Sequence, residues 1–452
     1  MATILLGIAV TVIDGTVANL ALPGMVRDLH THASDAVWIV NAYQLATLVL
    51  LLPLASLGDR LGYRRIYLVG VVLFTLASGL CSMASSLPTL AVARALQGMG
   101  AAGIMSVNPA LVRLTYPPSQ LGRGIALNSM VVATASVAGP VLAAAILSVA
   151  GWPWLFLVNV PLGVLLFLLG QRVLPANTLF TGPLRFSPLD IVLNGAMFVL
   201  LFVGADLLGG MGRGGEGGMG ASPAWGLGLL AACAAVGTVH VLRQRRLAHP
   251  LLPIDLLRIP VFRLSMATSV CAFAAQTMAY VALPFLFLDA WHHSPGQAGL
   301  LMACWPLGVI AAASVTGRLI GRFHGGLLGA IGLGVLALGL GLMGLAAASS
   351  AATEPAVWWR LAVCGLGFGL FQSPNNHTII TSAPAHRAGA ASGMLGTARL
   401  TGQSLGAALL AAVFALASAH DGGGAQAALA LSAGLAAAAA VFSGLRLRTT
   451  QA

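Results

Sequence analysis

One carboxyl group of this sequence stands deep inside an apolar stretch. Asp14 lies about thirteen residues into the stretch from Ala2 to Met25, which is roughly 20 Å along a helix. An ionised carboxylate is costly at that depth in hydrocarbon, and acids kept there usually carry protons or bind a cation. We therefore expect Asp14 to gain and lose a proton during function. The alternative is an acid held structurally by a hydrogen-bonding neighbour.

Three arginines also fall inside apolar stretches. Arg399 lies near the middle of its stretch, where it could face a cavity, meet Asp14 or bind an anionic group of a substrate. A purely structural bond to backbone carbonyls is the alternative. Arg94 and Arg360 lie nearer the ends of their stretches, where snorkelling to the membrane surface is a competing explanation. For Asp206, close to the end of another stretch, we expect a structural or interfacial role.

Several polar and aromatic residues of the apolar stretches are candidates for the wall of a substrate cavity, although each alone is more often a helix-packing contact. They are Tyr43, Asn108, Gln276, Tyr280, Trp305, Gln372 and Asn375. The five cysteines lack metal-ligand spacing, and the sequence contains no phosphate-binding loop or nucleophile elbow. We expect no enzymatic activity, no metal and no cofactor, with a proton gradient as the energy source.

Composition decides which elements carry these residues. Charged residues make up 7% of the 452 residues and the mean hydropathy is +0.93, whereas a soluble globular protein has about a quarter charged residues. Apolar stretches of about twenty residues, long enough to cross a bilayer, recur along the chain. The sequence therefore predicts an all-α membrane protein with fourteen spans. We place them near 2–26, 36–57, 66–87, 89–112, 124–149, 153–171, 188–208, 223–242, 260–288, 297–317, 325–348, 356–379, 389–417 and 425–445.

The basic residues predict the orientation of these spans. All 22 are arginines, and most of them fall in the connections on one side, while Arg27 and Arg213 fall on the other. Because cytoplasmic connections are rich in basic residues, both termini should lie in the cytoplasm and the protein in a bacterial inner membrane. The net charge of +11 then reflects contacts with anionic lipid headgroups rather than with nucleic acid.

The two halves of the sequence resemble each other. Thr16–Pro23 matches Thr277–Pro284 at an offset of 261, and four further pairs of positions recur at nearly the same offset. We predict two related six-helix bundles, residues 1–172 and 260–452, separated by residues 173–259 with two inserted spans. Parallel repeats of this kind are typical of transporters that bind their substrate between the repeats and expose it to each side in turn.

Five stretches carry motifs that are highly specific when they occur together in this order. They are Ile13-Asp14-Gly15-Thr16 through Pro23, Gly58-Asp59-Arg60-Leu61-Gly62-Tyr63-Arg64-Arg65, Arg94-Ala95-Leu96-Gln97-Gly98, Gly139-Pro140, and Trp152 through Gly163. With them the chain resembles, over essentially its whole length, the fourteen-span drug:proton antiporter branch of the major facilitator superfamily. The sequence departs from the family pattern at Ala55, where the loop motif normally opens with glycine. Gly321 stands where a second-half copy of that motif could hold an acid.

The resemblance implies roles for these residues. Asp14 and Arg94 would take part in proton coupling, and Asp14 could also hold a cationic substrate. Gly139-Pro140 would mark an antiporter, with a plain proline kink as the alternative. A cytoplasmic gate would consist of Asp59, Arg60, Gly62, Arg64 and Arg65. In this gate, Asp59 would cap the N-terminal end of the thirteenth span near Ala388.

We therefore expect a proton-coupled antiporter that exports small amphiphilic compounds by alternating access and contributes to antibiotic resistance. Drugs, dyes, quaternary ammonium cations and natural products are the expected cargo. The alternative is a proton symporter, or an exporter, of an organic anion bound by Arg399. Partners would be the small-molecule substrate, protons and membrane lipids, without nucleic acid, and we expect a monomer.

Overall fold

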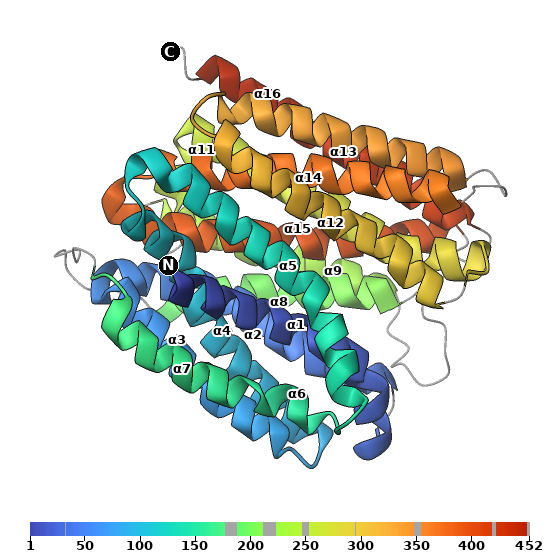
Figure 1. The fold of residues 1–452 in the computed structure, drawn as a ribbon, viewed down its shortest axis with the longest axis horizontal. Helices are drawn as coiled ribbons and strands as arrows, with labels where there is room; N and C mark the ends of the chain where they lie inside the picture. The colour runs from blue at the N-terminus through green and yellow to red at the C-terminus, as the bar shows by residue number, and fades with distance from the viewer. Residues whose placement is uncertain are drawn as a thin grey trace.

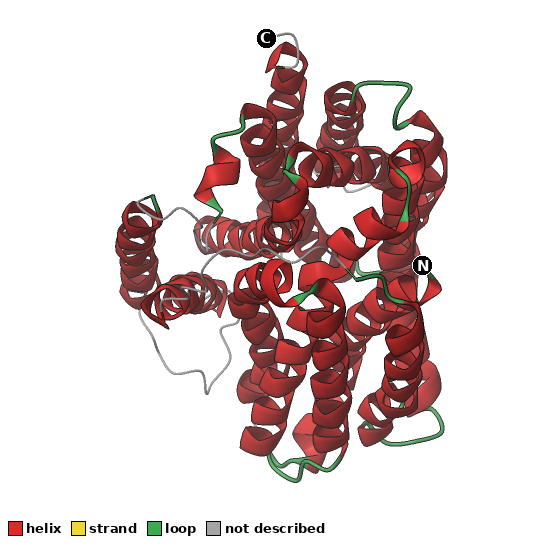
Figure 2. Cartoon of the chain, turned by 90° about the vertical axis from the view of Figure 1, so that its left-hand side faces the viewer, coloured by secondary structure: helices red, strands yellow, loops and turns green. Residues whose placement is uncertain are grey.

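The structure is a computed structural model that describes residues 1–31, 33–176, 188–210, 223–245, 253–293, 295–347, 354–417 and 422–449. Apart from an isolated bridge between Ile320 and Phe323, the regular structure of these residues is helical. Figure 2 shows helices making up nearly all of the described chain. The expected all-α fold is confirmed for this part of the protein.

The N-terminal half contains six long helical segments. They are α1 (Ala2–Asp28), α2 (Ala33–Leu61), α3 (Tyr63–Ser82), α4 (Leu87–Thr115), α5 (Leu121–Leu147) after the short η1 (Pro118–Gln120), and α6 (Pro153–Leu157) continued by α7 (Asn159–Val173). The sixth predicted span is thus interrupted at Val158. Pro161 cannot donate to the carbonyl of Leu157, so the helix opens one turn before the proline.

The inserted segment and the C-terminal half complete the bundle. The insertion holds α8 (Pro188–Gly210), α9 (Pro223–Gln244) and the short α10 (Ile254–Leu257). The C-terminal half holds α11 (Pro260–Phe285) with the π-helical turn η2 (Leu286–Ala290), α12 (Pro295–Leu319), α13 (Gly325–Ala347), α14 (Glu354–Ser382), η3 (Ala385–Arg387), α15 (Ala388–Leu416) and α16 (Gly423–Thr449). Among the described residues, nine helices are long and apolar enough to cross a membrane.

The helices of the two halves pair in the same pattern. In the N-terminal half, α2 and α3 pack on α4, α3 packs on α7, and α1 packs on α5. The C-terminal half repeats these contacts in the same order: α12 and α13 pack on α14, α13 packs on α16, and α11 packs on α15. The halves meet where α5 packs on α12 and α2 packs on α15. Because α2 corresponds to α12 and α5 corresponds to α15, these two contacts are equivalent under the pseudo-symmetry of the two halves. Figure 1 shows the two halves one above the other, with both chain termini toward the same side.

The hydrophobic clusters show where the two halves are joined. One cluster combines residues of both halves near the chain termini, including Ile4 and Leu111 with Ile379 and Met394. The clusters toward the opposite ends of the helices, such as the one around Trp152, draw their described buried residues from one half. The halves are therefore packed together at the end that carries the termini, which we call the terminal end.

Candidate functional site

A buried ion pair joins α1 and α4 inside the N-terminal half. Arg94 Nη1 lies 2.7 Å from Asp14 Oδ2, and both side chains are 0% exposed. The Arg94 Nε donates to the carbonyl of Ile39 at 3.0 Å. Arg94 therefore points into the bundle instead of snorkelling to the surface.

Two amide side chains complete the surroundings of the carboxylate. Gln97 Nε2 donates to Asp14 Oδ1 at 2.8 Å and Asn159 Nδ2 donates to the same oxygen at 2.6 Å. Gln97 Oε1 also accepts from Arg94 Nη1 at 2.6 Å. Sequence reasoning assigned no role to Gln97 or Asn159, although both lie in the motif stretches and both are polar residues of apolar spans.

The Asp14 carboxylate accepts hydrogen bonds from Arg94, Gln97 and Asn159. A carboxylate that accepts three donors, one of them a guanidinium, is fully compensated even without water. Protonating Asp14 in this arrangement would leave Arg94 buried without its counterion, and such a loss costs about 3–5 kcal/mol. Breaking this ion pair would therefore destabilise the packing of α1 against α4.

The ring of Tyr43 separates the ion pair from the space between the bundles. The Arg94 guanidinium carbon lies 4.3 Å from the centre of this ring, and the Tyr43 hydroxyl donates to the carbonyl of Thr11 at 3.0 Å. Gly98 allows the close approach, because a Cβ there would lie 3.0 Å from the Tyr43 Cα. Tyr43 thus contacts Arg94 on one face and lines the cavity on the other.

A cavity lies between the two halves at mid-height of the helices. Its larger lobe has a volume of about 250 Å³ and is lined by residues of α1, α2, α4, α5, α11, α12, α14 and α15. A smaller lobe of about 50 Å³ lies toward the terminal end. Both lobes include Met105, Val132, Phe273, Gln372 and Arg399.

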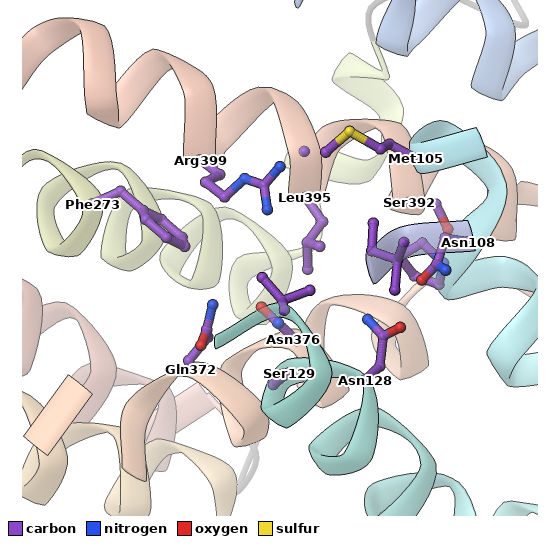
Figure 3. Close-up of a pocket in the computed structure, with 14 residues that line it drawn as sticks. Met105, Asn108, Asn128, Ser129, Phe273, Gln372, Asn376, Ser392, Leu395 and Arg399 are labelled. Atoms are coloured by element: carbon purple, nitrogen blue, oxygen red, sulfur yellow. The ribbon is translucent and has the colours of Figure 1, made fainter. Parts of the chain in front are cut away.

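Arg399 lines both lobes, and the other described residues of their walls are uncharged. It takes part in none of the hydrogen bonds or ion pairs found in the described part of the chain. Figure 3 shows its guanidinium in a space that also holds the amides of Gln372, Asn376, Asn108 and Asn128. The cavity therefore combines a largely apolar wall with several amide side chains and the positive charge of Arg399.

At the terminal end, Asp59 at the end of α2 lies against the start of α15. Its Oδ1 accepts from the Gly389 N–H at 2.8 Å and its Oδ2 from the Ala390 N–H at 3.1 Å. The Tyr63 hydroxyl donates to Asp59 Oδ1 at 2.6 Å. A Cβ on Gly389 would lie 2.5 Å from Asp59 Oδ1, so glycine permits this contact. A carboxylate at a helix N-terminus is favourable for the helix dipole, and here it joins the two halves.

The other predicted gate residues surround this contact. Gly62 has φ of 103°, a left-handed conformation that favours glycine, and it lets α3 start directly after α2. The Arg64 guanidinium donates to the carbonyl of Gln171, which ties this turn to the end of α7. Arg65 is exposed, and Arg60 is partly buried beside Asp59.

The pseudo-symmetric contact between α12 and α5 carries no acid. A Cβ on Gly122, at the start of α5, would lie 2.9 Å from the Ile320 Cβ, so apolar packing stands where Asp59 stands in the other half. Arg113 adds a second link between the halves by donating to the carbonyls of Ile380 and Ala383 at 2.6 and 3.0 Å. The charged closure of the terminal end is thus asymmetric.

Gly139 of α5 packs against α1 close to Asp14. A Cβ at this position would lie 3.1 Å from the Thr16 Cβ and 3.4 Å from the Ile13 carbonyl oxygen. The glycine therefore sets the distance between α5 and the part of α1 that carries Asp14. The side chain of its neighbour Pro140 lies outside the described residues, as does that of Asp206 in α8.

Residues 4–407 match the Major Facilitator Superfamily. The chain belongs to this superfamily. It is 48% identical over 449 residues to the uncharacterized transporter YebQ of Escherichia coli (strain K12), covering 98% of this chain and 94% of that protein. It is 31% identical over 424 residues to the tetracenomycin C resistance and export protein of Streptomyces glaucescens, covering 90% and 74%.

A solved structure supports the superfamily fold. The crystal structure of the human organic anion transporter MFSD10 superposes with a TM-score of 0.70 and covers 98% of both chains, at 16% identity. The chain therefore has the fold of a transporter superfamily, and it is a multi-pass membrane protein rather than an enzyme.

The structure places the predicted substrate-binding residues of this transporter in two groups. Those that line the cavity are Tyr43, Asn108, Gln276, Tyr280, Gln372 and Arg399. Asp14, Trp305 and Asn375 lie outside its described lining. The suggested meeting of Arg399 with Asp14 is not found, because Arg94, Gln97 and Asn159 bind the Asp14 carboxylate.

Trp305 and Asn375 have other neighbours. Trp305 is buried with its ring centre 5.0 Å from that of Tyr280, so it supports the cavity wall from behind. Asn375 donates to Ser269 Oγ at 2.7 Å and accepts from Arg446 Nη1 at 2.8 Å inside the C-terminal half. Neither residue can contact a molecule in the cavity in this conformation.

Four amide residues of the cavity wall were not predicted. They are Gln44, Asn128, Asn376 and Gln403. Two of them follow a lining residue by four positions, as Asn376 follows Gln372 and Gln403 follows Arg399, and this spacing puts each pair on one helix face. The spacing is the signal that could have identified them.

Proposed function

We propose that this chain is a proton-coupled antiporter that exports small amphiphilic compounds by alternating access, with both termini in the cytoplasm. One observation carries the proposal: a fully buried Asp14–Arg94 pair stands beside a cavity between the two halves, with Tyr43 between them. A proton on Asp14 can change the packing of α1 and α4 without reaching the substrate directly.

The closure at the terminal end defines the state from which the cycle starts. With Asp59 bound to the start of α15, the cytoplasmic side is closed and the substrate leaves to the outside. Asp14 then takes up a proton, Arg94 loses its counterion, and α1 and α4 repack. Because Tyr43 contacts Arg94, this change reaches α2, and α2 carries Asp59 at its end.

The same elements reset the transporter. Release of the Asp59 contact opens the cytoplasmic side, where Asp14 gives up its proton and a new substrate enters the cavity. Re-formation of the ion pair then favours the closed terminal end again. A single titrating group gives one proton per cycle, so an entering proton contributes about 1.4 kcal/mol per pH unit and about 2.3 kcal/mol per 100 mV.

The direction of transport is part of the proposal. The export function named for the Streptomyces glaucescens relative and the Gly139-Pro140 motif both favour export. Uptake by proton symport is the alternative on the same fold. Substrate added to acid-loaded vesicles separates the two, because an antiporter carries protons out of the acidic lumen as substrate enters, whereas a symporter moves both in one direction.

Susceptibility of an efflux-deficient bacterium tests the proposal. Cells that express the wild type should survive higher concentrations of several amphiphilic toxic compounds than cells with an empty vector. Asp14→Asn should lose this protection, because it cannot form the ionised pair with Arg94. Asp28→Asn is the matched control, since Asp28 lies at the end of the same helix and accepts one hydrogen bond from Trp152. Equal protection by Asp14→Asn and the wild type would refute the coupling.

A further inference from the structure

The charge of the cavity wall indicates which charge a transported compound should carry. This inference rests on the proposed function as an exporter. In the part of the chain that the structure describes, the two acids of the predicted coupling and gate motifs are already engaged: Asp14 is bound by Arg94 behind the ring of Tyr43, and Asp59 is bound by α15. Among the described lining residues of both lobes there is no aspartate or glutamate, and Arg399 supplies a positive charge. A cationic substrate would meet repulsion here without a compensating carboxylate.

The neighbours of Arg399 favour one arrangement of the cargo. The wall of the larger lobe contains the aromatic rings of Tyr43, Tyr280, Phe273 and Phe368, with Phe273 and Phe368 packed edge to face at 5.4 Å. In the smaller lobe, the Asn108 Oδ1, Asn128 Oδ1 and Ser129 Oγ atoms are buried and have no hydrogen-bond partner. Arg399 lines both lobes, so it lies where an aromatic frame and a hydrogen-bonding substituent would meet.

We propose that the exported compounds are amphiphilic aromatic anions, whose carboxylate or acidic hydroxyl binds the Arg399 guanidinium. The aromatic frame fills the larger lobe, and a hydroxyl or N–H substituent donates to the amide and hydroxyl oxygens of the smaller lobe. Guanidinium suits this task because it stays charged and binds planar oxyanions through two donors.

Two consequences distinguish an anion from a cation. First, the anion does not compete with a proton for Asp14, so its binding should not weaken as the pH falls, whereas a cation held by Asp14 would be displaced. Second, one proton entering and one anion leaving move two positive charges inward per cycle. A cation exchanged for one proton moves none.

Two xanthene dyes with the same ring frame provide the test, namely anionic dichlorofluorescein and cationic rhodamine 123. Purified protein in proteoliposomes with an acidic lumen, oriented so that uptake corresponds to export, should accumulate dichlorofluorescein at least tenfold more than rhodamine 123. Making the lumen more positive by about 60 mV should raise the limiting accumulation about 100-fold, since each charge contributes about tenfold. Arg399→Gln should lose at least tenfold of the anion uptake, Arg399→Lys should retain part of it, and exposed Arg448→Gln should leave it unchanged.

A second variant keeps the test valid should Arg399→Gln fail to fold. Gln276→Glu adds an acid to the cavity wall with little change in shape, and it should shift the preference toward rhodamine 123 at least tenfold. Preference of the wild type for rhodamine 123, or anion uptake that survives Arg399→Gln, would overturn the inference while leaving proton-driven export intact. Absence of pH-driven uptake of both dyes would instead overturn the exporter proposal itself.

Discussion

Removing the charge of Asp59 should open the terminal end of the transporter. In the structure, the carboxylate accepts from the backbone N–H groups of Gly389 and Ala390 at 2.8 and 3.1 Å. Asp59→Asn keeps the size of the side chain, but it replaces two charge-assisted hydrogen bonds by at most one neutral bond. The favourable interaction of the carboxylate with the helix dipole of α15 is lost as well.

The magnitude follows from these contacts. A hydrogen bond to a charged group contributes about 1.5–3 kcal/mol and a neutral one about 0.5–1.5 kcal/mol. Two such bonds lost and one neutral bond kept mean that the closed state should lose about 1.5–5.5 kcal/mol relative to the open state. A difference of 1.4 kcal/mol corresponds to tenfold in an equilibrium constant, so the ratio of closed to open molecules should fall at least about tenfold.

Spin labels on the two halves measure this ratio directly. Ser119, before α5, and Arg322, after α12, are exposed at the terminal end in opposite halves. In a protein whose five native cysteines are replaced, labels on Ser119→Cys and Arg322→Cys should give mainly one short distance. Asp59→Asn should add a longer distance as a major population.

The matched control is Asp190→Asn, which removes an ion pair with Arg243 in the inserted helices. That pair does not join the two halves, so the distance distribution should stay as in the wild type. An unchanged distribution in Asp59→Asn would refute the assignment of Asp59 to the closure. A change of equal size in Asp190→Asn would show that loss of any aspartate loosens the bundle.

Two further predictions concern the residues around these contacts. Asn159→Ala removes one of the donors to Asp14 Oδ1 and leaves that carboxylate oxygen less well compensated, so pH-driven dye export in vesicles should fall at equal membrane abundance. Export at the wild-type rate would contradict the role of Asn159. Gly389→Ala places a Cβ 2.6 Å from the Ala55 carbonyl oxygen and should lower export at least tenfold at equal membrane abundance. Gly434→Ala is the control, because this helix glycine has open space around it, and it should leave export unchanged. Equal export rates of the two variants would show that the close approach of α15 to α2 is dispensable.

The bundle architecture was predictable because its signals are local or periodic. Stretches of about twenty apolar residues predict spans, and the match of Thr16–Pro23 with Thr277–Pro284 predicts two related halves. The interruption at Val158 was not predicted, although Pro161 supplies its physical cause. Orientation in the membrane and the monomeric state stay predictions.

The partners of the site residues were harder to predict from the sequence. In a membrane bundle both the lipid and the protein interior are apolar, so the hydrophobic pattern does not tell which face of a helix points inward. Asn375 was therefore grouped with the cavity residues, although it faces Arg446, whereas Asn376 at the next position lines the cavity. Likewise, depth along the span suggested that Arg399 could meet Asp14, but only packing shows that Arg94 holds that carboxylate.

The central claim is that Asp14 couples the proton gradient to transport, and exchange measured with and without a gradient tests it most directly. In proteoliposomes loaded with a transported dye, wild-type protein should perform both gradient-free exchange of labelled for unlabelled dye and accumulation driven by an acidic lumen. Asp14→Asn should keep a substantial part of the exchange but lose the pH-driven accumulation. Accumulation by Asp14→Asn at the wild-type level would contradict the account.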